Sequence, residues 1–473
     1  MRFFIDPFGC VKNQVDAETM MALLGGAGWL AVETADDADL IIINSCGFIE
    51  SAKQESINAV LGWRKRYPDK KILLAGCLAQ RYAKELAESL PEADLLFGNA
   101  DLGGIVGAAA RALGLKADAA AIRNAAAVSV AGQRPLLSLP GSAYVKINEG
   151  CNNRCTFCSI PLIRGNLRSR SIPDILSECR ELLGRGIREL CLIGQDIGSY
   201  GKDLRTGPET EPAALDQGSL LPGSLLPDLL EALSGLEGDF WVRLLYIHPD
   251  NFPLSILDTM ERDKRRNPYH PRFLPYFDLP FQHGSEKILA AMNRRGNAAA
   301  YLSLIETIRS RLPDAVLRST FLLGFPGETD EDFQALLDFQ DKARLDWAGC
   351  FAYSREEDTP AYSMKNRVPK KLAAERKRIV EERQADISEK RMDRFVGKEF
   401  DVLVEEAIDE EEGLYLGRLY CQAPEVDGAA VISDTRMASG SDQHLTPGAF
   451  VRGRVTGRAG FDLEVAVSLN KSP

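Results

Sequence analysis

Three cysteines lie within eight residues of one another, in the stretch Cys151-Asn152-Asn153-Arg154-Cys155-Thr156-Phe157-Cys158. A structural zinc site draws four ligands from paired cysteine or histidine spacings, and no suitable fourth cysteine or histidine lies nearby in the sequence. Three thiolates instead suit a [4Fe–4S] cluster that leaves one iron open to an outside ligand. The amino and carboxylate groups of S-adenosylmethionine (SAM) can chelate that iron, and one electron from the cluster then cleaves the sulfonium to a 5′-deoxyadenosyl radical. The spacing therefore predicts a SAM-binding cluster, with an incidental cysteine-rich loop as the alternative.

A second set of three cysteines, Cys10, Cys46 and Cys77, is widely spaced in the sequence. Each follows a short apolar run that we predict to be a strand, at residues 2–5, 40–43 and 71–75. In open parallel sheets, ligands bind at the carboxyl ends of the strands, so these three thiols can converge on one edge. Three buried core cysteines are the alternative, because free cysteine is often buried.

The first 115 residues alternate these strands with amphipathic stretches. Helices are predicted at 17–28, at 56–66 and near 81–89. Such alternation is typical of a parallel sheet covered on both faces, so the prediction for residues 1–115 is a doubly wound α/β domain. Residues 116–136 are rich in alanine with little apolar pattern, and we expect them to form a linker.

A second series of strands and helices follows, over residues 137–388. The predicted strands lie at 142–147, 189–193, 241–246, 276–278, 316–323 and 349–353. About six strand–helix units make a partial (β/α)6-type barrel and fall short of the eight of a complete barrel. The close cysteine triplet follows the first of these strands, so it would lie in the first loop at the mouth of the barrel, where such folds place their chemistry.

The last part of the chain has a different pattern. A charged amphipathic helix is predicted from 369 to about 395, and short strands follow at 399–404, 429–432, 450–457 and 463–469. Strands of this length, separated by glycine and proline, predict a small antiparallel β-barrel over 391–469. Residues 203–226, rich in glycine, proline and leucine, are expected to form a surface loop or insertion.

Composition narrows the class of protein. The chain has 473 residues, a net charge of −11 and a sequence pI of about 5.2, so it is a poor default binder of nucleic acid. Neither a signal peptide nor an apolar stretch long enough to span a membrane is found, which predicts a cytoplasmic protein without a membrane partner. In that compartment ten cysteines favour metal or redox chemistry over a disulfide framework, although Cys179, Cys191, Cys350 and Cys421 lack any ligand pattern and are expected to pack in the core.

The chain resembles the radical-SAM superfamily and, more narrowly, the methylthiotransferases, over nearly its whole length. The contexts of the cysteines match that family, as does the run Leu279-Pro280-Phe281-Gln282-His283-Gly284-Ser285. Further matching stretches are Ile160-Pro161 with Arg164-Gly165, Leu192-Ile193-Gly194-Gln195-Asp196, and Thr320-Phe321-Leu322-Leu323-Gly324-Phe325-Pro326-Gly327-Glu328-Thr329. The resemblance implies a methylthiotransferase amino-terminal domain, a radical-SAM core and a carboxy-terminal TRAM barrel.

It also implies two [4Fe–4S] clusters. Cys151, Cys155 and Cys158 would hold the cluster that cleaves SAM, and Cys10, Cys46 and Cys77 would hold a second cluster that carries the sulfur to be transferred. A second SAM would act as methyl donor. An external electron donor and a sulfur donor are implied as partners. The amino-terminal domain would have to close over the barrel so that both clusters face one cavity.

Several other residues are candidates for binding SAM. Gln195 and the loop with Gly324, Gly327 and Glu328 follow predicted strands, where backbone amides can contact ligand carboxylate and ribose; simple turn formation is the alternative for the glycines. Phe157, between two cluster ligands, would shield the cluster or stack on adenine. His283 would either contact SAM or the substrate, or have a structural role.

Two branches of this family differ in substrate: one modifies tRNA adenosine at the 2-position, the other the β-carbon of an aspartate in ribosomal protein S twelve of the small subunit. The motif Gly9-Cys10-Val11-Lys12-Asn13-Gln14-Val15-Asp16 is similar to the ribosomal-protein branch, whereas the tRNA enzymes usually have G-C-Q-M-N. Phe157 stands where the tRNA enzymes commonly have tyrosine, and the run from Ala423 to Gly428 looks like the TRAM form of the ribosomal-protein branch.

Charge gives a separate argument. Residues 398–473 contain seven basic and fourteen acidic residues, a net charge of −7. A barrel that grips tRNA needs lysine and arginine to neutralise phosphates, whereas an acidic barrel suits a basic ribosomal protein. Two alternatives remain for this segment: a merely solvated acidic face, and a local basic edge made by Arg452, Arg454 and Arg458. The expected function is methylthiolation of ribosomal protein S twelve without direct tRNA binding; the alternatives are the tRNA enzyme and a ribosome-assembly factor with structural clusters.

Overall fold

The computed structural model describes residues 1–115, 133–204, 224–268, 270–435 and 444–467. Most of the predicted linker 116–136 and of the predicted loop 203–226 therefore lies outside the described residues. The chain forms two compact units. Unit 1 comprises Met1–Leu137, Glu149–Arg168 and Ser354–Ser363, and unit 2 comprises Ser138–Asn148, Ser169–Tyr353 and Met364–Pro473. The close cysteine triplet thus belongs to the same unit as the amino-terminal domain.

Unit 1 contains a five-stranded sheet in which every pair of strands is parallel, as predicted. The order across the sheet is β2-β1-β3-β4-β5, so β1, β3 and β4 are neighbours. The strands are β1 (Arg2–Pro7), β2 (Leu30–Ala31), β3 (Leu40–Ser45), β4 (Lys71–Gly76) and β5 (Leu95–Phe97).

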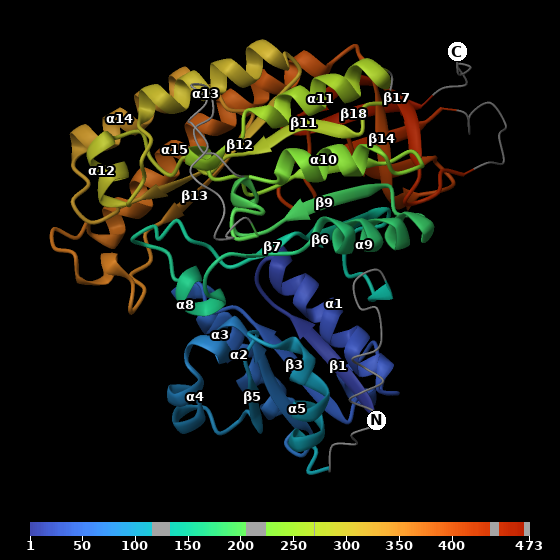
Figure 1. The fold of residues 1–473 in the computed structure, drawn as a ribbon, viewed down its shortest axis with the longest axis vertical. Helices are drawn as coiled ribbons and strands as arrows, with labels where there is room; N and C mark the ends of the chain where they lie inside the picture. The colour runs from blue at the N-terminus through green and yellow to red at the C-terminus, as the bar shows by residue number, and fades with distance from the viewer. Residues whose placement is uncertain (116–132, 205–223, 269, 436–443, 468–473) are drawn as a thin grey trace. The chain divides into compact units, whose positions relative to one another are not determined.

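Helices cover both faces of this sheet, which confirms the doubly wound arrangement (Figure 1). On one face, α1 (Val11–Gly26) and α5 (Ile105–Ala112) pack on the strands through a buried apolar cluster. On the other face, a second apolar cluster joins the strands to α2 (Glu50–Arg66), α3 (Cys77–Arg81) and α4 (Ala83–Ser89). The alternating side chains of each buried strand supply both clusters.

Two of these elements begin or end where the apolar pattern did not predict. Helix α1 begins at Val11 rather than at 17, because its first turns carry Lys12, Asn13 and Asp16, which are polar and nevertheless buried. Strand β1 continues through Asp6 and Pro7, which the sequence suggested would interrupt it. Both differences fall at the edge of the sheet where Cys10 lies.

Unit 2 contains an open sheet of six parallel strands in the order β13-β12-β11-β10-β9-β6, which confirms the partial barrel. The strands are β6 (Ser142–Lys146), β9 (Glu189–Ile193), β10 (Trp241–Leu244), β11 (Phe273–Asp278), β12 (Val316–Leu323) and β13 (Trp347–Ala352). The helices between them are α9 (Ile172–Gly184), α10 (Leu226–Ser234), α11 (Ser255–Arg266), α12 (Glu286–Ala291), α13 (Ala298–Arg311) and α14 (Asp330–Ala343). Short elements β7 (Asn148–Glu149), α8 (Ile160–Arg164) and β8 (Arg168–Ser169) flank the cysteine triplet.

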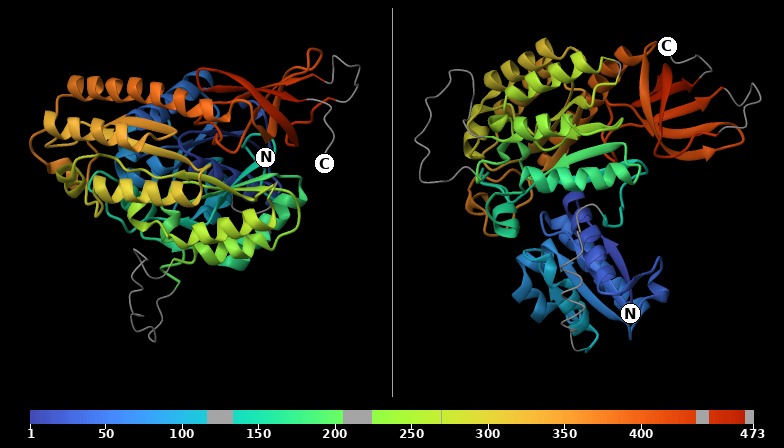
Figure 2. Two further views of the ribbon diagram at one scale, coloured as in Figure 1. Left: turned by 90° about the horizontal axis from the view of Figure 1, so that it is seen from above. Right: turned by 45° about the vertical axis from the view of Figure 1, so that its right-hand side comes forward.

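The predicted long helix is α15 (Lys370–Met392), and it leads to a closed five-stranded barrel, drawn in red in Figure 2. Its strands are β14 (Glu399–Asp409), β15 (Leu414–Arg418), β16 (Ala430–Asp434), β17 (Phe450–Ala459) and β18 (Asp462–Val467). Strand β15 was not predicted, and β16 pairs with β18 in parallel, whereas the other pairs are antiparallel. Within the described part of the chain, no helix has both the length and the apolar character needed to cross a membrane.

A buried ionic network joins this barrel to the parallel sheet of unit 2. Glu189 on β9 accepts from Arg243 Nε at 2.7 Å and from Arg418 Nη2 at 2.6 Å, and Arg418 Nε also donates to Glu405 at 2.6 Å. Burial raises the pKa of Glu189, but the two guanidiniums outweigh it and lower that pKa to about 2. The carboxylate is therefore ionised at neutral pH and holds two buried cations.

Replacing Glu189 with glutamine is expected to lower the free energy of unfolding of unit 2 by about 3–5 kcal/mol, because it leaves Arg243 and Arg418 buried without their anion. Urea unfolding followed by circular dichroism measures this. The matched control is Glu231→Gln, whose exposed pairs with Arg262 and Arg266 predict a loss below about 1 kcal/mol. Equal midpoints for the two variants would contradict the assignment.

Candidate active site

The sheet of unit 1 brings Cys10, Cys46 and Cys77 to one edge. In the register of the sheet, Pro7 at the end of β1 lies beside Asn44, and Ser45 at the end of β3 lies beside Gly76. Each cysteine comes at most three residues after its strand ends, so the expected convergence is observed.

The three thiols are close enough to influence one another electrostatically. Burial raises the pKa of the Cys77 thiol to about 12; Arg164 partly opposes this, and Cys10 and Cys46 add to it. Burial likewise raises the pKa of Cys46, and Cys10 contributes to that shift. Cys10 itself is exposed. Without metal these buried thiols are protonated at neutral pH, so metal binding must displace their protons.

Glycines allow the loops that carry these cysteines to approach closely. A Cβ at Gly47 would lie 2.8 Å from the backbone of Cys77, and a Cβ at Gly9 would lie 2.9 Å from Cys46 Cβ. Gly9 also has a φ of +93°, which favours glycine. Cys10 directly precedes α1 and occupies its N-cap position.

The close triplet lies on a loop closed by its own hydrogen bonds. The Cys151 amide donates to the Gly165 carbonyl at 3.2 Å, and the Leu167 amide donates to Asn152 Oδ1 at 3.1 Å. Cys155 is buried, whereas Cys151, Cys158 and Phe157 are half-buried. The loop therefore presents its thiols without a long unsupported segment.

Among the described residues, no group of three or more histidine, cysteine, aspartate or glutamate side chains is close enough to hold a single metal ion. The ligands of a [4Fe–4S] cluster bind different irons and stand farther apart than the ligands of one ion. Two sets of three thiols, with no carboxylate or imidazole among the donors, fit iron–sulfur clusters better than zinc, magnesium or calcium.

Arg164 lies between the two cysteine sets within unit 1. It is at the end of α8, six residues after Cys158, and its Nη2 donates to Asn13 Oδ1 at 2.7 Å, to Asp16 Oδ2 at 2.9 Å and to Cys77 Sγ at 3.3 Å. In the sequence this arginine stands out only as part of a family motif. Nothing in a single sequence distinguishes it from a surface arginine, because Asp16 is 148 positions away.

A second buried charge that was not predicted is Glu356, in the segment Ser354–Ser363 of unit 1. Its Oε2 accepts from Arg81 Nη1 at 2.8 Å and pairs with Lys53 Nζ at 3.2 Å. Arg81 also donates to the Gly47 carbonyl, beside Cys46, at 3.0 Å. In the same segment, the Ala361 amide donates to the Thr156 carbonyl inside the cysteine triplet, at 2.9 Å. The segment thus contacts both cysteine loops.

The proposed SAM residues of unit 2 follow strands β9 and β12. Gln195 is half-buried after β9. Gly324 and Gly327 have φ values of +75° and +88°, so both glycines are needed for the turn after β12. Their positions at the carboxyl ends of parallel strands are those where such sheets bind ligands.

Glu328 is engaged inside this loop. Its carboxylate accepts from the Gly324 amide at 2.7 Å and from Arg376 Nη1 at 2.6 Å, and it lies 3.5 Å from His283 Nε2. Burial raises the pKa of Glu328, but His283, Arg376 and the Gly324 amide together hold it below its ordinary value. His283 Nδ1 accepts from the Ser285 amide, so the ring proton lies on Nε2, facing Glu328. Glu328 and His283 therefore stabilise the conformation of the loop after β12.

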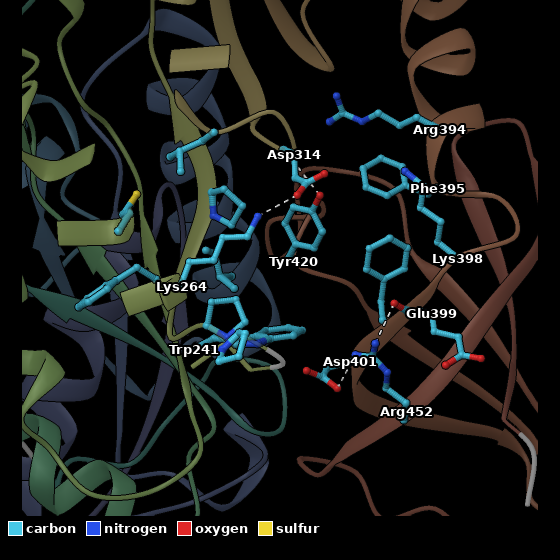
Figure 3. A pocket seen from close by; sticks show the side chains of 18 residues that line it. Trp241, Lys264, Asp314, Arg394, Phe395, Lys398, Glu399, Asp401, Tyr420 and Arg452 are labelled. Atoms are coloured by element: carbon cyan, nitrogen blue, oxygen red, sulfur yellow. Dashed lines mark hydrogen bonds and ion pairs between the residues drawn. The ribbon is translucent and has the colours of Figure 1, made fainter. Parts of the chain in front are cut away.

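A cavity of about 320 Å³ lies at the other end of the same sheet, where Trp241 begins β10 and Phe273 begins β11 (Figure 3). Two ion pairs lie among its lining residues: Lys264 Nζ with Asp314 at 3.1 Å, and Arg452 with Asp401 at 3.1 Å. None of the predicted site residues lines it. It is therefore separate from the candidate active site.

The remaining cysteines are buried, as predicted: Cys179, Cys191, Cys350 and Cys421. Each arginine of the possible basic edge of the barrel pairs with a carboxylate. Arg452 pairs with Asp401, Arg454 with Glu399 at 3.2 Å, and Arg458 with Asp393 at 2.6 Å. In contrast, the β14–β15 turn exposes Asp409, Glu410, Glu411 and Glu412.

Known families match three parts of the chain. Residues 2–98 match a family described as uncharacterized protein family UPF0004, residues 145–339 the radical SAM superfamily, and residues 396–467 the TRAM domain. Ribosomal protein uS12 methylthiotransferase RimO of Treponema denticola is 46% identical over 478 residues, covering 97% of this chain and 99% of the relative. The protein of the same name from Thermosipho africanus is 40% identical over 430 residues, covering 90% and 92%.

Solved structures show the same fold. The radical S-adenosylmethionine methyltransferase TsrM from Kitasatospora setae, determined with cobalamin and a [4Fe–4S] cluster, superimposes with a TM-score of 0.52 at 14% identity, covering 76% of each chain. At that identity the likeness supports the fold alone.

Proposed function

The chain belongs to the family of ribosomal protein uS12 methylthiotransferases (RimO), which are radical-SAM enzymes with a TRAM domain, and on that premise we propose that it inserts a methylthio group at the β-carbon of an aspartate in uS12. The family uses a [4Fe–4S] cluster and SAM. The proposal includes two clusters, the assignment of their ligands and uS12 as the substrate.

The observation that carries the proposal is the presence of two sets of three cysteines in unit 1. Cys10, Cys46 and Cys77 follow three adjacent strands, and Cys151, Cys155 and Cys158 lie on one closed loop. With three protein ligands each, both clusters would leave one iron for an outside ligand, and they would supply SAM cleavage at one site and a place for sulfur at the other.

The residues of the chain prepare these sites. Gly47 and Gly9 let the loops approach, Arg164 and Asn99 place N–H donors on the sulfur of Cys77, and the α1 amino terminus lies at Cys10. In unit 2, Gly324 and Gly327 allow the turn at the end of β12, where Glu328 and Arg376 would fix the loop for SAM. Half-buried Phe157 would cover the cluster or stack on adenine.

The charges on the barrel favour a protein substrate over tRNA. Its arginines are engaged by carboxylates, while the β14–β15 turn presents four exposed acidic residues. A basic ribosomal protein fits that charge, whereas the phosphates of tRNA would meet repulsion. An external electron donor and a sulfur donor complete the proposed set of partners.

Mass spectrometry of uS12 from a strain that lacks this chain tests the proposal. We expect the β-methylthio group on the uS12 aspartate to disappear in that strain and to return when the intact chain is supplied again. A methylthio group that persists on uS12 would contradict the proposal. Loss of methylthio from tRNA adenosine, with uS12 unchanged, would instead establish the tRNA alternative.

A further inference from the structure

One buried cation bridges the two cysteine sets in unit 1. Arg164 is 6% exposed, and its short helix follows Cys158 directly, yet its guanidinium contacts Asn13, Asp16 and Cys77 of the amino-terminal domain. It is a rigid connection between the loop with the SAM-cluster ligands and a ligand of the other cluster.

We propose that Arg164 is a positioning residue that fixes the Cys151–Cys158 loop to Cys77 and favours the reduced state of the cluster held by Cys10, Cys46 and Cys77. The inference rests on the proposed function, which supplies that cluster.

The electrostatic reason is the charge that a reduced cluster gains. Each added electron makes the cluster and its thiolates more negative, and a guanidinium 3.3 Å from the Sγ of buried Cys77 stabilises that charge. An N–H group that donates to a ligating sulfur has the same effect on the potential. Asn99 Nδ2 donates to the same sulfur at 3.3 Å and adds to it.

Two carboxylates hold the guanidinium and oppose its charge. Asp16 Oδ2 accepts from Arg164 Nη2 at 2.9 Å, and Glu149 Oε1 accepts from Nη1 at 2.9 Å. The side chains of Arg164 and Asp16 are almost fully buried, whereas that of Glu149 is 20% exposed. Because Glu149 is negative and Arg164 is positive, removing the charge of Glu149 should shift the reduction potential in the direction opposite to that of an Arg164 variant. A merely structural ion pair predicts no such reversal of sign.

The test measures the reduction potential of the Cys10/Cys46/Cys77 cluster by redox titration followed by EPR. The parent is the full-length chain with Cys151, Cys155 and Cys158 replaced by alanine, so that a single cluster gives the signal. Added to this parent are Arg164→Gln, Arg164→Lys, Glu149→Gln and a matched control, Arg168→Gln. Arg168 is an exposed arginine four residues farther along the chain, at the start of β8.

We expect Arg164→Gln to shift the reduction equilibrium at least about tenfold toward the oxidised state, which is 59 mV lower for one electron, at unchanged iron content. Arg164→Lys should shift it less, Glu149→Gln should shift it toward the reduced state, and Arg168→Gln should leave it within about twofold.

Equal potentials for the parent and Arg164→Gln, with iron retained, would overturn the inference. If Arg164→Gln loses its iron, Glu149→Gln decides: a raised potential supports the inference and an unchanged one overturns it. A parent that binds no cluster would instead overturn the proposed function itself, so the two failures are distinguishable.

Discussion

Replacing Cys155 with alanine is expected to abolish reductive cleavage of SAM, lowering 5′-deoxyadenosine formation by at least about a thousandfold, because two thiolates cannot retain the cluster that delivers the electron. The loop itself should persist, since its closing hydrogen bonds, from the Cys151 amide to Gly165 and from the Leu167 amide to Asn152, do not involve this thiol. Chromatography of the products after reduction under anaerobic conditions measures the effect. Iron should fall to about four per chain, the share of the remaining cluster.

The control for this prediction is Cys350→Ala, which removes another buried thiol, on β13 in unit 2, that lies outside both cysteine sets. It should keep its iron and cleave SAM at the parental rate. A Cys155→Ala protein that still forms 5′-deoxyadenosine at the parental rate would show that the triplet does not hold the SAM cluster.

Replacing Cys77 with alanine is expected to separate the two halves of the reaction. The Cys151–Cys158 loop remains, so SAM cleavage should continue at a rate within a few-fold of the parent. Methylthiolated uS12 peptide should fall at least about a hundredfold, because the cluster that carries the sulfur is lost. Assays of 5′-deoxyadenosine and of modified peptide on the same sample measure both quantities.

The matched control is Cys421→Ala, a buried thiol in unit 2. It should lose neither activity. Parallel loss of both activities in Cys77→Ala would mean that the clusters are not separable in this way, and full methylthiolation by that variant would remove Cys77 from the site.

The order of strands and helices could be predicted because apolar spacing reports burial. The run at 40–43 is entirely buried in β3, and the barrel strands were found from alternating residues between glycines. Strand β15 was missed because the acidic run before it and Gly417 within it obscure the alternation over its five residues.

The start of α1 could not be predicted, for a different reason. Lys12, Asn13 and Asp16 look like exposed polar residues in the sequence but are buried; Asn13 contacts Cys77, and Asp16 contacts Arg164. Asn13, for example, donates to the Phe8 and Ser45 carbonyls and accepts from Arg164. Apolar periodicity fails where polar residues are buried for function.

The convergence of Cys10, Cys46 and Cys77 on one edge of the sheet could be predicted because each follows a strand, whereas their role as cluster ligands stays a prediction. Arg164 and Glu356 could not be predicted, because a buried charge is identified by its partners, and these come from distant parts of the chain. For Glu328 the sequence suggested a cofactor contact, which stays a prediction; the partners of its carboxylate, the Gly324 amide and Arg376, are seen only in the structure.

Iron and acid-labile sulfide per chain, measured on protein purified and reconstituted without oxygen, test the central claim most directly. Two clusters on the six cysteines predict about eight of each for the intact chain, about four for the variant that lacks Cys151, Cys155 and Cys158, and about four for the variant that lacks Cys10, Cys46 and Cys77. About four in the intact chain, all of it lost with the first triple variant, would contradict the account.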